Sequence, residues 1–256
     1  MQIVIFGANG MTGRLLTRRV LDAGHSAVAV TRRPNDFPIT DPRLTIAGAD
    51  VRRDGLAGIV AGADAVLSTL GVPFTRQPVD TYSVGTGNIV NTMRETGVNR
   101  LIVVSSTGAY PAPGRRDAPL MLRLFEPIIT RTIGKTVYDD IRRMEALVRE
   151  SGLGWTIVRP SGLFDLPQAT NYVAGETDPV GAFTARIDLA DYLVRLAQDG
   201  TARRKTVVVS TTEHAPTVWE MIRREAFKSD VPRRAERVTA GTTRDTGRSD
   251  YTFGAR

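Results

Sequence analysis

The sequence predicts an α/β fold in which helices cover both faces of a doubly wound parallel sheet. Short apolar runs alternate with segments of helical periodicity along most of the 256 residues, and this alternation is typical of a parallel sheet. The first apolar run, residues 3–6, enters a glycine-spaced turn and leaves as an amphipathic segment. With 41% hydrophobic and 24% charged residues, the composition is that of an ordinary globular protein. We therefore predict one main domain over residues 1–212, followed by a small C-terminal helix and a polar tail over 213–256.

Three glycines, Gly7, Gly10 and Gly13, separate the first predicted strand from the first helix. In a nucleotide-binding turn, Gly7 allows a sharp bend, Gly10 leaves room for a pyrophosphate, and Gly13 lets the helix pack closely on the strand. The helix N-terminus attracts phosphate through free N–H groups and a partial positive charge. A glycine-rich turn can exist without a ligand, and the GxxGxxG spacing is a variant of the common GxGxxG pattern. The order strand, turn, helix favours a Rossmann-type nucleotide-binding domain.

The end of the second predicted strand, residues 27–30, indicates which dinucleotide binds. Proteins that select NAD place an acid near this point to bind the ribose 2′-hydroxyl, whereas an arginine accommodates the 2′-phosphate of NADP. Here the strand is followed by Arg32 and Arg33, and Arg14 stands just beyond the third glycine. Each arginine alone is more often a solvated side chain at a loop edge. Together they predict charge-assisted bonds to the phosphate and a preference for NADP(H) over NAD(H).

The next two strands are predicted to form the adenine side and one wall of the site. Asp50 and Val51 follow the third strand, residues 44–47, where Asp50 can accept from the exocyclic amine of adenine and Val51 can pack on the ring. Alternatively, Asp50 caps the short helix that follows. Gly71 ends the fourth strand, residues 65–70, and is expected to let the backbone approach the cofactor.

Hydroxyl side chains follow the fifth predicted strand, residues 101–104, at the ligand-binding edge of the sheet. Ser105, Ser106 and Thr107 stand there, and Tyr110 follows shortly after. A hydroxyl at this position can donate to a substrate carbonyl or bind the nicotinamide ribose. It can equally well do no more than cap the turn.

Residues 111–136 interrupt the alternation of strands and helices. Prolines bracket an apolar group within this segment, which reads PAPGRRDAPLMLRLFEPIITRTIGKT. Long insertions near an active edge commonly form lids, so one interpretation is a flap over an apolar substrate. The other interpretation is a packing helix or the surface of a homodimer.

The rest of the chain completes the sheet and its covering helices. The predicted elements are a helix at 137–150, a buried strand at 155–158, a helix at 186–196 capped by Asp188, a strand at 205–210 and a short amphipathic helix at 217–227. Residues 228–256 are polar and nearly free of aliphatic side chains, so we expect a poorly ordered tail there.

Composition excludes several kinds of site. The chain has no cysteine, which rules out disulfides and thiolate catalysis, and His25 and His214 stand far apart, so we expect no metal site. No apolar run approaches the roughly 20 residues that span a bilayer, and the first strand begins without a basic leader. We therefore expect a cytoplasmic protein without membrane contact. The arginines behind the net charge of +7 are spread along the chain, which argues against nucleic acid as a partner.

These features resemble the atypical short-chain dehydrogenase/reductase group, NAD(P)H-binding proteins similar to biliverdin reductase B (flavin reductase) and the NmrA-like proteins. The resemblance covers residues 1–212 and rests on VIFGANGMTGR, Arg32, GADV ending at Val51, LIVVSSTGAY, the pair Asp139-Asp140 and RESGLGWTIVRPSGL. It implies a cofactor-binding set of Gly7, Asn9, Gly10, Met11, Thr12, Gly13, Arg32, Asp50, Val51, Leu70, Gly71 and Ser105. It also implies an active-site serine at Ser106, and Tyr110 is our second catalytic candidate.

One part of the family pattern is missing. Ordinary short-chain dehydrogenases use a Tyr-x-x-x-Lys pair, in which the lysine lowers the tyrosine pKa. Tyr138 and Arg142 have this spacing, but an arginine does not exchange its proton usefully. The register counted from the downstream SGL places the pair at Val137 and Ile141 instead. Alcohol and ketone chemistry is therefore disfavoured.

The remaining chemistry is hydride transfer to a small, planar, apolar acceptor that needs little help from a proton donor. Flavins, quinones and conjugated tetrapyrroles fit this description. The sequence thus predicts an NADPH-dependent reductase. Two alternatives stay open: a non-catalytic NAD(P)-sensing scaffold of NmrA type, and an epimerase acting on a nucleotide-linked sugar, which the missing pair also disfavours.

Overall fold

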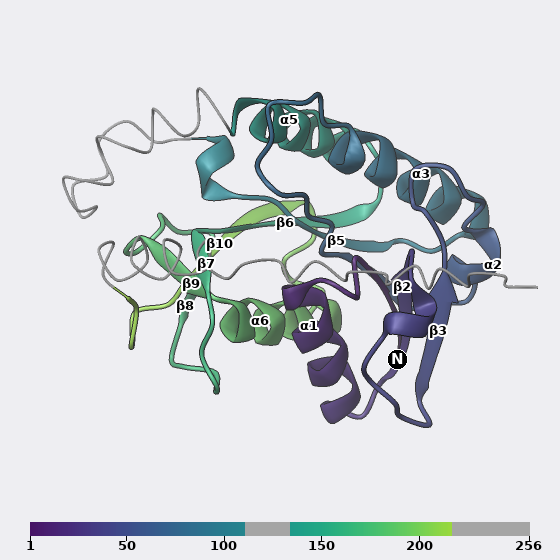
Figure 1. The fold of residues 1–256 in the computed structure, drawn as a ribbon, viewed down its shortest axis with the longest axis horizontal. Helices are drawn as coiled ribbons and strands as arrows, with labels where there is room; N and C mark the ends of the chain where they lie inside the picture. The colour runs from purple at the N-terminus through teal and green to yellow at the C-terminus, as the bar shows by residue number, and fades with distance from the viewer. Residues whose placement is uncertain (111–133, 217–256) are drawn as a thin grey trace, which may run out of the picture.

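An eight-stranded, mostly parallel sheet forms the centre of the protein. The structure is a computed structural model that describes residues 1–110 and 134–216 (Figure 1). The strands lie in the order β3, β2, β1, β4, β5, β6, β10, β8, and among these described strands only β8 runs antiparallel to its neighbour. Their bounds are β1 Gln2–Phe6, β2 Ser26–Thr31, β3 Leu44–Gly48, β4 Ala65–Ser68, β5 Arg100–Val104, β6 Gly154–Pro160, β8 Val173–Gly175 and β10 Lys205–Ser210. The strand order reverses beyond β1, between β1 and β4, which confirms the predicted doubly wound α/β fold.

Helices cover both faces of this sheet (Figure 1). One face carries α1 (Met11–Asp22) and α6 (Arg186–Gln198), which pack against each other. The opposite face carries α2 (Ala57–Val60), α3 (Thr81–Thr96) and α5 (Lys135–Arg149). Two short 3-10 helices, η1 (Pro34–Asp36) and η2 (Thr107–Ala109), follow β2 and β5.

The central strands are buried on both faces, which explains why they read as continuous apolar runs in the sequence. In β1, Val4 and Phe6 belong to the core under α3 and α5, whereas Ile3 and Ile5 belong to the core beside α1 and α6. None of these four side chains is more than 1% exposed. The core therefore consists of two apolar layers separated by the sheet.

Residues 161–185 contain strands that the sequence did not predict. β7 (Gly162–Phe164) and β9 (Phe183–Ala185) pair in parallel as a second, two-stranded sheet. The predicted cap of the following helix is wrong, because α6 has Ala185 at its N-cap and Asp188 lies within its first turn. The buried Asp188 carboxylate instead accepts hydrogen bonds from the Thr170 backbone and hydroxyl and from the Thr211 hydroxyl, at 2.6–2.8 Å. Asp188 thus holds two loops against α6.

Some predicted segments fall outside the described residues. These are residues 111–133 of the predicted lid, the predicted helix at 217–227 and the predicted tail at 228–256. The last residues assigned to the lid, 135–136, form the first turn of α5, so that helix begins two residues earlier than predicted. In the described ranges, no helix combines the length and apolar character needed to cross a membrane.

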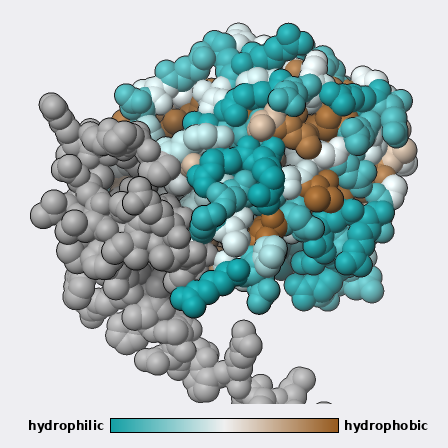
Figure 2. Space-filling model, turned by 90° about the horizontal axis from the view of Figure 1, so that it is seen from above, coloured by the Kyte–Doolittle hydropathy of each residue, from teal (hydrophilic) through white to brown (hydrophobic). Residues whose placement is uncertain are grey.

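The outer surface above α3 and α5 is mostly hydrophilic. Figure 2 shows the molecule from this side, and the hydrophobic residues form separate small groups on the part that the structure describes. Two exposed apolar side chains are Val84 of α3 and Phe74 of the loop after β4, which are 46% and 53% exposed. A homodimer stays a prediction.

Candidate functional site

The turn between β1 and α1 requires glycine at two positions because of backbone packing. Gly7 has a φ of +76°, and a Cβ there would lie 2.7 Å from the Thr69 carbonyl oxygen. A Cβ at Gly13 would lie 2.3 Å from the Gly7 carbonyl oxygen and 2.7 Å from the Ala8 Cα. The first position therefore needs glycine for the turn, and the third needs it for close packing of helix and strand, as the spacing predicts.

Gly10 is less crowded than these two glycines. A Cβ at Gly10 would meet only the Gly7 carbonyl oxygen, at 3.3 Å, among the described residues, and Gly10 is exposed at the N-cap of α1. No side chain caps this helix, and no acid occupies its first turn. The N–H groups of the first turn are therefore available to an anion, which is the property required of a pyrophosphate site.

Side chains of the turn support the same use. Asn9 accepts a hydrogen bond from Arg14 Nε at 2.9 Å, so the guanidinium of Arg14 is held beside the turn. Met11 is 55% exposed, and Thr12 is half-buried. Cofactor contacts by these four residues stay predictions, and the structure places all of them on one continuous stretch.

Arg32 and Arg33 lie at the carboxyl end of β2, beside the glycine turn. The two segments meet where the Ala8 N–H donates to the Val30 carbonyl oxygen at 3.3 Å. Both arginines are exposed, and Arg33 faces Asp36 of η1 at 3.6 Å with both side chains largely in solvent. Such an exposed pair is weak. Arg32 makes no ion pair with any residue in the described ranges. These guanidiniums therefore fit the predicted contact with a 2′-phosphate.

Asp50 does not cap the following helix, so that alternative interpretation is wrong. α2 begins at Ala57, with Leu56 at its N-cap. The pKa of Asp50 lies below its ordinary value because the Arg52 backbone N–H and guanidinium hydrogen-bond to the carboxylate. Arg52 also reaches Asp80, at 3.3 Å. Asp50 is thus a fixed, ionised acceptor at the end of β3.

The neighbouring part of the carboxyl edge of the sheet is lined by Val51, Leu70 and Gly71. A Cβ on Gly85 of α3 would lie 2.9 Å from Val51 Cγ1 and 3.3 Å from Leu70 Cδ1, so both side chains pack where α3 begins. At Gly71 a Cβ would meet no described atom within 4 Å. The backbone at Gly71 is therefore open to a ligand, as expected for a cofactor wall.

The two serines after β5 have different surroundings. The Ser105 hydroxyl donates to the buried Glu145 carboxylate at 2.5 Å, and the Ser105 backbone N–H donates to the Val158 carbonyl oxygen at 2.7 Å, so neither proton is left for a cofactor. The Ser106 oxygen accepts from the Gly108 N–H at 3.1 Å and thereby caps η2. Since a hydroxyl donates as well as accepts, the Ser106 proton remains available for a substrate.

Tyr138 of α5 lies against the turn that Ser106 begins. A Cβ on Gly108 would lie 2.6 Å from the Tyr138 hydroxyl oxygen, and the Tyr138 ring contacts Phe74 at 5.8 Å between centroids. One turn along α5, Arg142 donates to the Ala109 carbonyl oxygen at 2.6 Å and to Asp139. The α5 face that meets η2 therefore carries the Tyr-x-x-x-Arg pair.

The register counted from the downstream SGL places this pair at Val137 and Ile141, which the structure buries. Both side chains belong to the core between α5 and the sheet, with exposures of 3% and 4%. The sequence did contain a signal against that register, because Val137, Ile141, Met144 and Val148 recur at the spacing of a buried helix face.

Tyr110 lies apart from Tyr138, on a cluster of charged side chains. The Arg159 guanidinium stacks on the Tyr110 ring at 4.0 Å, and Arg159 in turn pairs with Glu145. Burial lowers the pKa of Arg149, but hydrogen bonds to Glu145 and to the Tyr110 hydroxyl raise it above its ordinary value. Sequence reasoning missed Glu145, Arg149 and Arg159 as members of this cluster.

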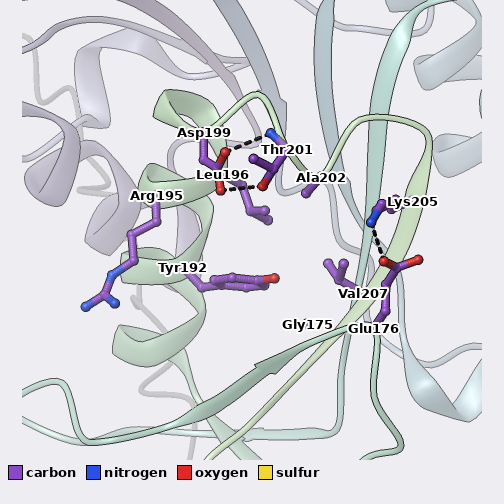
Figure 3. A pocket seen from close by; sticks show the side chains of 10 residues that line it. All are labelled: Gly175, Glu176, Tyr192, Arg195, Leu196, Asp199, Thr201, Ala202, Lys205 and Val207. Atoms are coloured by element: carbon purple, nitrogen blue, oxygen red, sulfur yellow. Dashed lines mark hydrogen bonds and ion pairs between the residues drawn. The ribbon is translucent and has the colours of Figure 1, made fainter.

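A separate cleft of about 320 Å³ lies at the opposite edge of the sheet (Figure 3). It is formed by the C-terminal half of α6, the amino end of β10 and the end of β8. Its lining residues are Gly175, Glu176, Tyr192, Arg195, Leu196, Asp199, Thr201, Ala202, Lys205 and Val207. The Tyr192 ring extends across the cleft, and Lys205 pairs with Glu176 at 2.5 Å. Because ligands of this fold bind at the carboxyl ends of the strands, this cleft is not the dinucleotide site.

The described residues contain no group of three or more His, Cys, Asp or Glu side chains arranged to hold a metal ion.

The known proteins that are similar in sequence include two kinds of uncharacterized relative. An uncharacterized chloroplastic protein of Arabidopsis thaliana is 29% identical over 230 residues, covering 84% of this chain and 78% of its own. Uncharacterized mycobacterial relatives are 31% identical over 149 residues, which is 57% of this chain but only 17% of theirs.

Two solved structures share the fold. A short-chain dehydrogenase/reductase of Veillonella parvula in complex with NADP superimposes with a TM-score of 0.66 and 20% identity, covering 83% of this chain and 95% of its own. ChuY, an anaerobillin reductase of Escherichia coli O157:H7, superimposes with a TM-score of 0.62 and 20% identity, covering 85% of this chain and 100% of its own.

The profile of the NAD(P)H-binding family matches residues 7–200, from the first glycine of the turn to the segment before β10. This match spans well over half of the chain and includes every predicted site residue. The resemblance inferred from the sequence motifs is thereby confirmed, and the protein belongs to the NAD(P)H-binding family of Rossmann-fold proteins.

Proposed function

We propose that the protein is an NADPH-dependent reductase that transfers hydride to a small, planar, apolar acceptor such as a flavin or quinone. The observation that carries this proposal is the contact of Tyr138 with Gly108, next to Ser106, together with Arg142 in place of a lysine. Arginine stays protonated and is tied here to Ala109 and Asp139, so it does not relay a proton. An acceptor that needs little proton transfer suits this arrangement.

The preference for NADPH rests on the end of β2. Arg32 and Arg33 supply exposed guanidiniums where an NAD-selective protein has an acid. The NADP complex of the Veillonella parvula relative supports the same preference.

Each part of the site has a role in this reaction. Reduced nicotinamide supplies the hydride when the cofactor is bound. The turn at Gly10 and the N-terminus of α1 hold the pyrophosphate, and the open backbone at Gly71 borders the nucleotide. Ser106 donates a hydrogen bond to the acceptor atom that gains charge, and Tyr138 is placed to orient the acceptor ring. The reductase activity of ChuY, a structural neighbour, is consistent with this assignment.

The test is NADPH oxidation by the full-length protein with FMN, riboflavin and small quinones. We expect turnover with NADPH, and a decrease of about 10-fold for Ser106→Ala, the effect of one hydrogen bond to a group that gains charge. Nucleotide affinity should be unchanged in that variant. Tight NADPH binding without turnover of any acceptor would refute the reductase assignment.

One observation favours a second candidate, a non-catalytic NAD(P) sensor. Arg142 stands at the spacing from Tyr138 that the lysine has in a Tyr-x-x-x-Lys pair, and its guanidinium is already bound by Ala109 and Asp139. A sensor requires nucleotide binding but no hydride transfer, so the same titration and turnover measurements separate the two candidates.

A further inference from the structure

A buried carboxylate joins three elements beside the proposed acceptor site. Glu145 of α5 is 0% exposed. Its carboxylate accepts hydrogen bonds from Arg159 Nε at 2.9 Å, from Arg159 Nη2 at 2.5 Å and from Arg149 Nη2 at 2.6 Å. The Ser105 hydroxyl donates to the same carboxylate. Glu145 thus links α5 to the ends of β5 and β6, next to Ser106.

The charges in this cluster do not balance. Two guanidiniums, Arg149 and Arg159, share the single negative charge of Glu145. Nearer the start of α5, Lys135 and Arg142 likewise share Asp139. Among the described residues, the four cations Lys135, Arg142, Arg149 and Arg159 thus share two carboxylates, Asp139 and Glu145. A local surplus of positive charge attracts anions.

Arg159 is the member of the cluster whose guanidinium can still donate a hydrogen bond to a ligand. Glu145 occupies its Nε and Nη2, whereas its Nη1 donates to none of the described residues. The side chain is 20% exposed, and the ring of Tyr110, itself 38% exposed, covers one face of the guanidinium. Since the carboxylate and the ring fix the orientation, the free Nη1 edge is pre-organised and loses little entropy on binding.

We propose that Arg159 Nη1 and the ring of Tyr110 form a subsite for an oxyanion carried by the acceptor, a carboxylate or a phosphate. The proposal rests on the proposed reductase function and specifies its substrate class as planar acceptors with an anionic group. Tyr110 then acts by contact with the acceptor and by holding the Arg159 guanidinium against its ring.

The experiment compares FMN with riboflavin, which differ by one phosphate. Binding to the full-length protein loaded with NADP⁺ is measured by flavin fluorescence, so the result does not depend on turnover. We expect FMN to bind roughly 10- to 100-fold more tightly than riboflavin, as for one charge-assisted contact. Arg159→Gln should bring the ratio close to one and leave NADPH affinity unchanged. A naphthoquinone sulfonate and the neutral naphthoquinone repeat the comparison without a phosphate.

Arg195→Gln is the matched control. Arg195 also pairs with an acid, Asp191, at 2.9 Å, and lies over a tyrosine ring, Tyr172, at 5.4 Å, but it belongs to α6 on the other face of the sheet. This variant should keep the full preference for FMN. If Arg159→Gln does not fold, Arg159→Lys keeps a cation for Glu145 while removing Nη1, and it should also reduce the ratio.

Equal binding of FMN and riboflavin by the wild-type protein overturns the subsite, as does a ratio that Arg159→Gln and Arg159→Lys leave unchanged. A preference for FMN without hydride transfer to any acceptor overturns the reductase function and leaves the subsite standing. The two failures are therefore distinguishable.

Discussion

The hydroxyl oxygen of Tyr138 lies 2.6 Å from the point that a Cβ on Gly108 would occupy. A side chain at this position would displace the Tyr138 phenol from its place against the η2 turn. This contact places the one tyrosine of the Tyr-x-x-x-Arg pair beside Ser106.

The first prediction concerns Gly108→Ala. The added methyl group displaces the Tyr138 ring, and we expect acceptor turnover to fall about 10-fold, the loss of one oriented contact in the transition state. NADPH affinity, measured by titration, should stay the same. Gly58→Ala is the control, because a Cβ there meets nothing within 4 Å. Full turnover by Gly108→Ala would show that Tyr138 has no part in the reaction.

The second prediction concerns the glycine turn. In Gly13→Ala, the methyl group meets backbone atoms of Gly7 and Ala8, which cannot move without separating α1 from β1. We expect a loss of stability of about 1–3 kcal/mol by thermal or urea unfolding and at least a 10-fold loss of NADPH affinity. Gly55→Ala, another position with open space, should change neither quantity. Unaltered NADPH binding in Gly13→Ala would contradict our assignment of the phosphate site.

The third prediction concerns cofactor choice. Replacing Arg32 and Arg33 by glutamine removes the cations expected to face the 2′-phosphate. We expect the NADPH dissociation constant to rise roughly 10- to 100-fold, the loss of one charge-assisted hydrogen bond of about 1.5–3 kcal/mol, while NADH affinity changes little. Parallel titrations with both nucleotides measure this. If the variant loses affinity for NADH and NADPH by the same factor, these arginines do not bind the 2′-phosphate.

The fourth prediction concerns the buried Glu145. Burial alone raises its pKa, but hydrogen bonds from Arg159, Ser105 and Arg149 outweigh burial, and the pKa lies below its ordinary value of 4.5. A carboxylate with a depressed pKa stabilises the fold fully above the unfolded pKa and loses this effect as the pH falls through the folded pKa. The free energy of unfolding of the wild type should therefore exceed that of Glu145→Gln by the largest amount above about pH 4.5, and this difference should shrink at lower pH.

At neutral pH, Glu145→Gln leaves two guanidiniums without their carboxylate, so we expect a loss of about 3–5 kcal/mol in the free energy of unfolding. Denaturant unfolding of both proteins from pH 3.5 to pH 7 provides the measurement. A difference that does not vary with pH would show that the Glu145 charge does not stabilise the fold.

The sequence by itself determined the doubly wound sheet and the nucleotide turn. Both depend on local patterns: continuous apolar runs for strands buried on two faces, and glycines where the backbone of the turn meets β4 and α1. Gly7 and Gly13 need no distant side chain to explain them, so their spacing carried the prediction directly. The same holds for Arg32, which follows β2 immediately.

Only the tertiary structure decided what the side chains after β5 face. Ser105 and Ser106 look alike in sequence, yet Ser105 is bound by Glu145, 40 residues away, whereas Ser106 stays at the turn. The register of α5 also followed from packing, because the burial of Val137 and Ile141 turns Tyr138 toward Gly108. Such pairings join residues far apart in the chain, and a local pattern does not encode which distant partner a side chain meets. Their geometry exists only once the sheet brings the carboxyl ends of β5 and β6 together under α5.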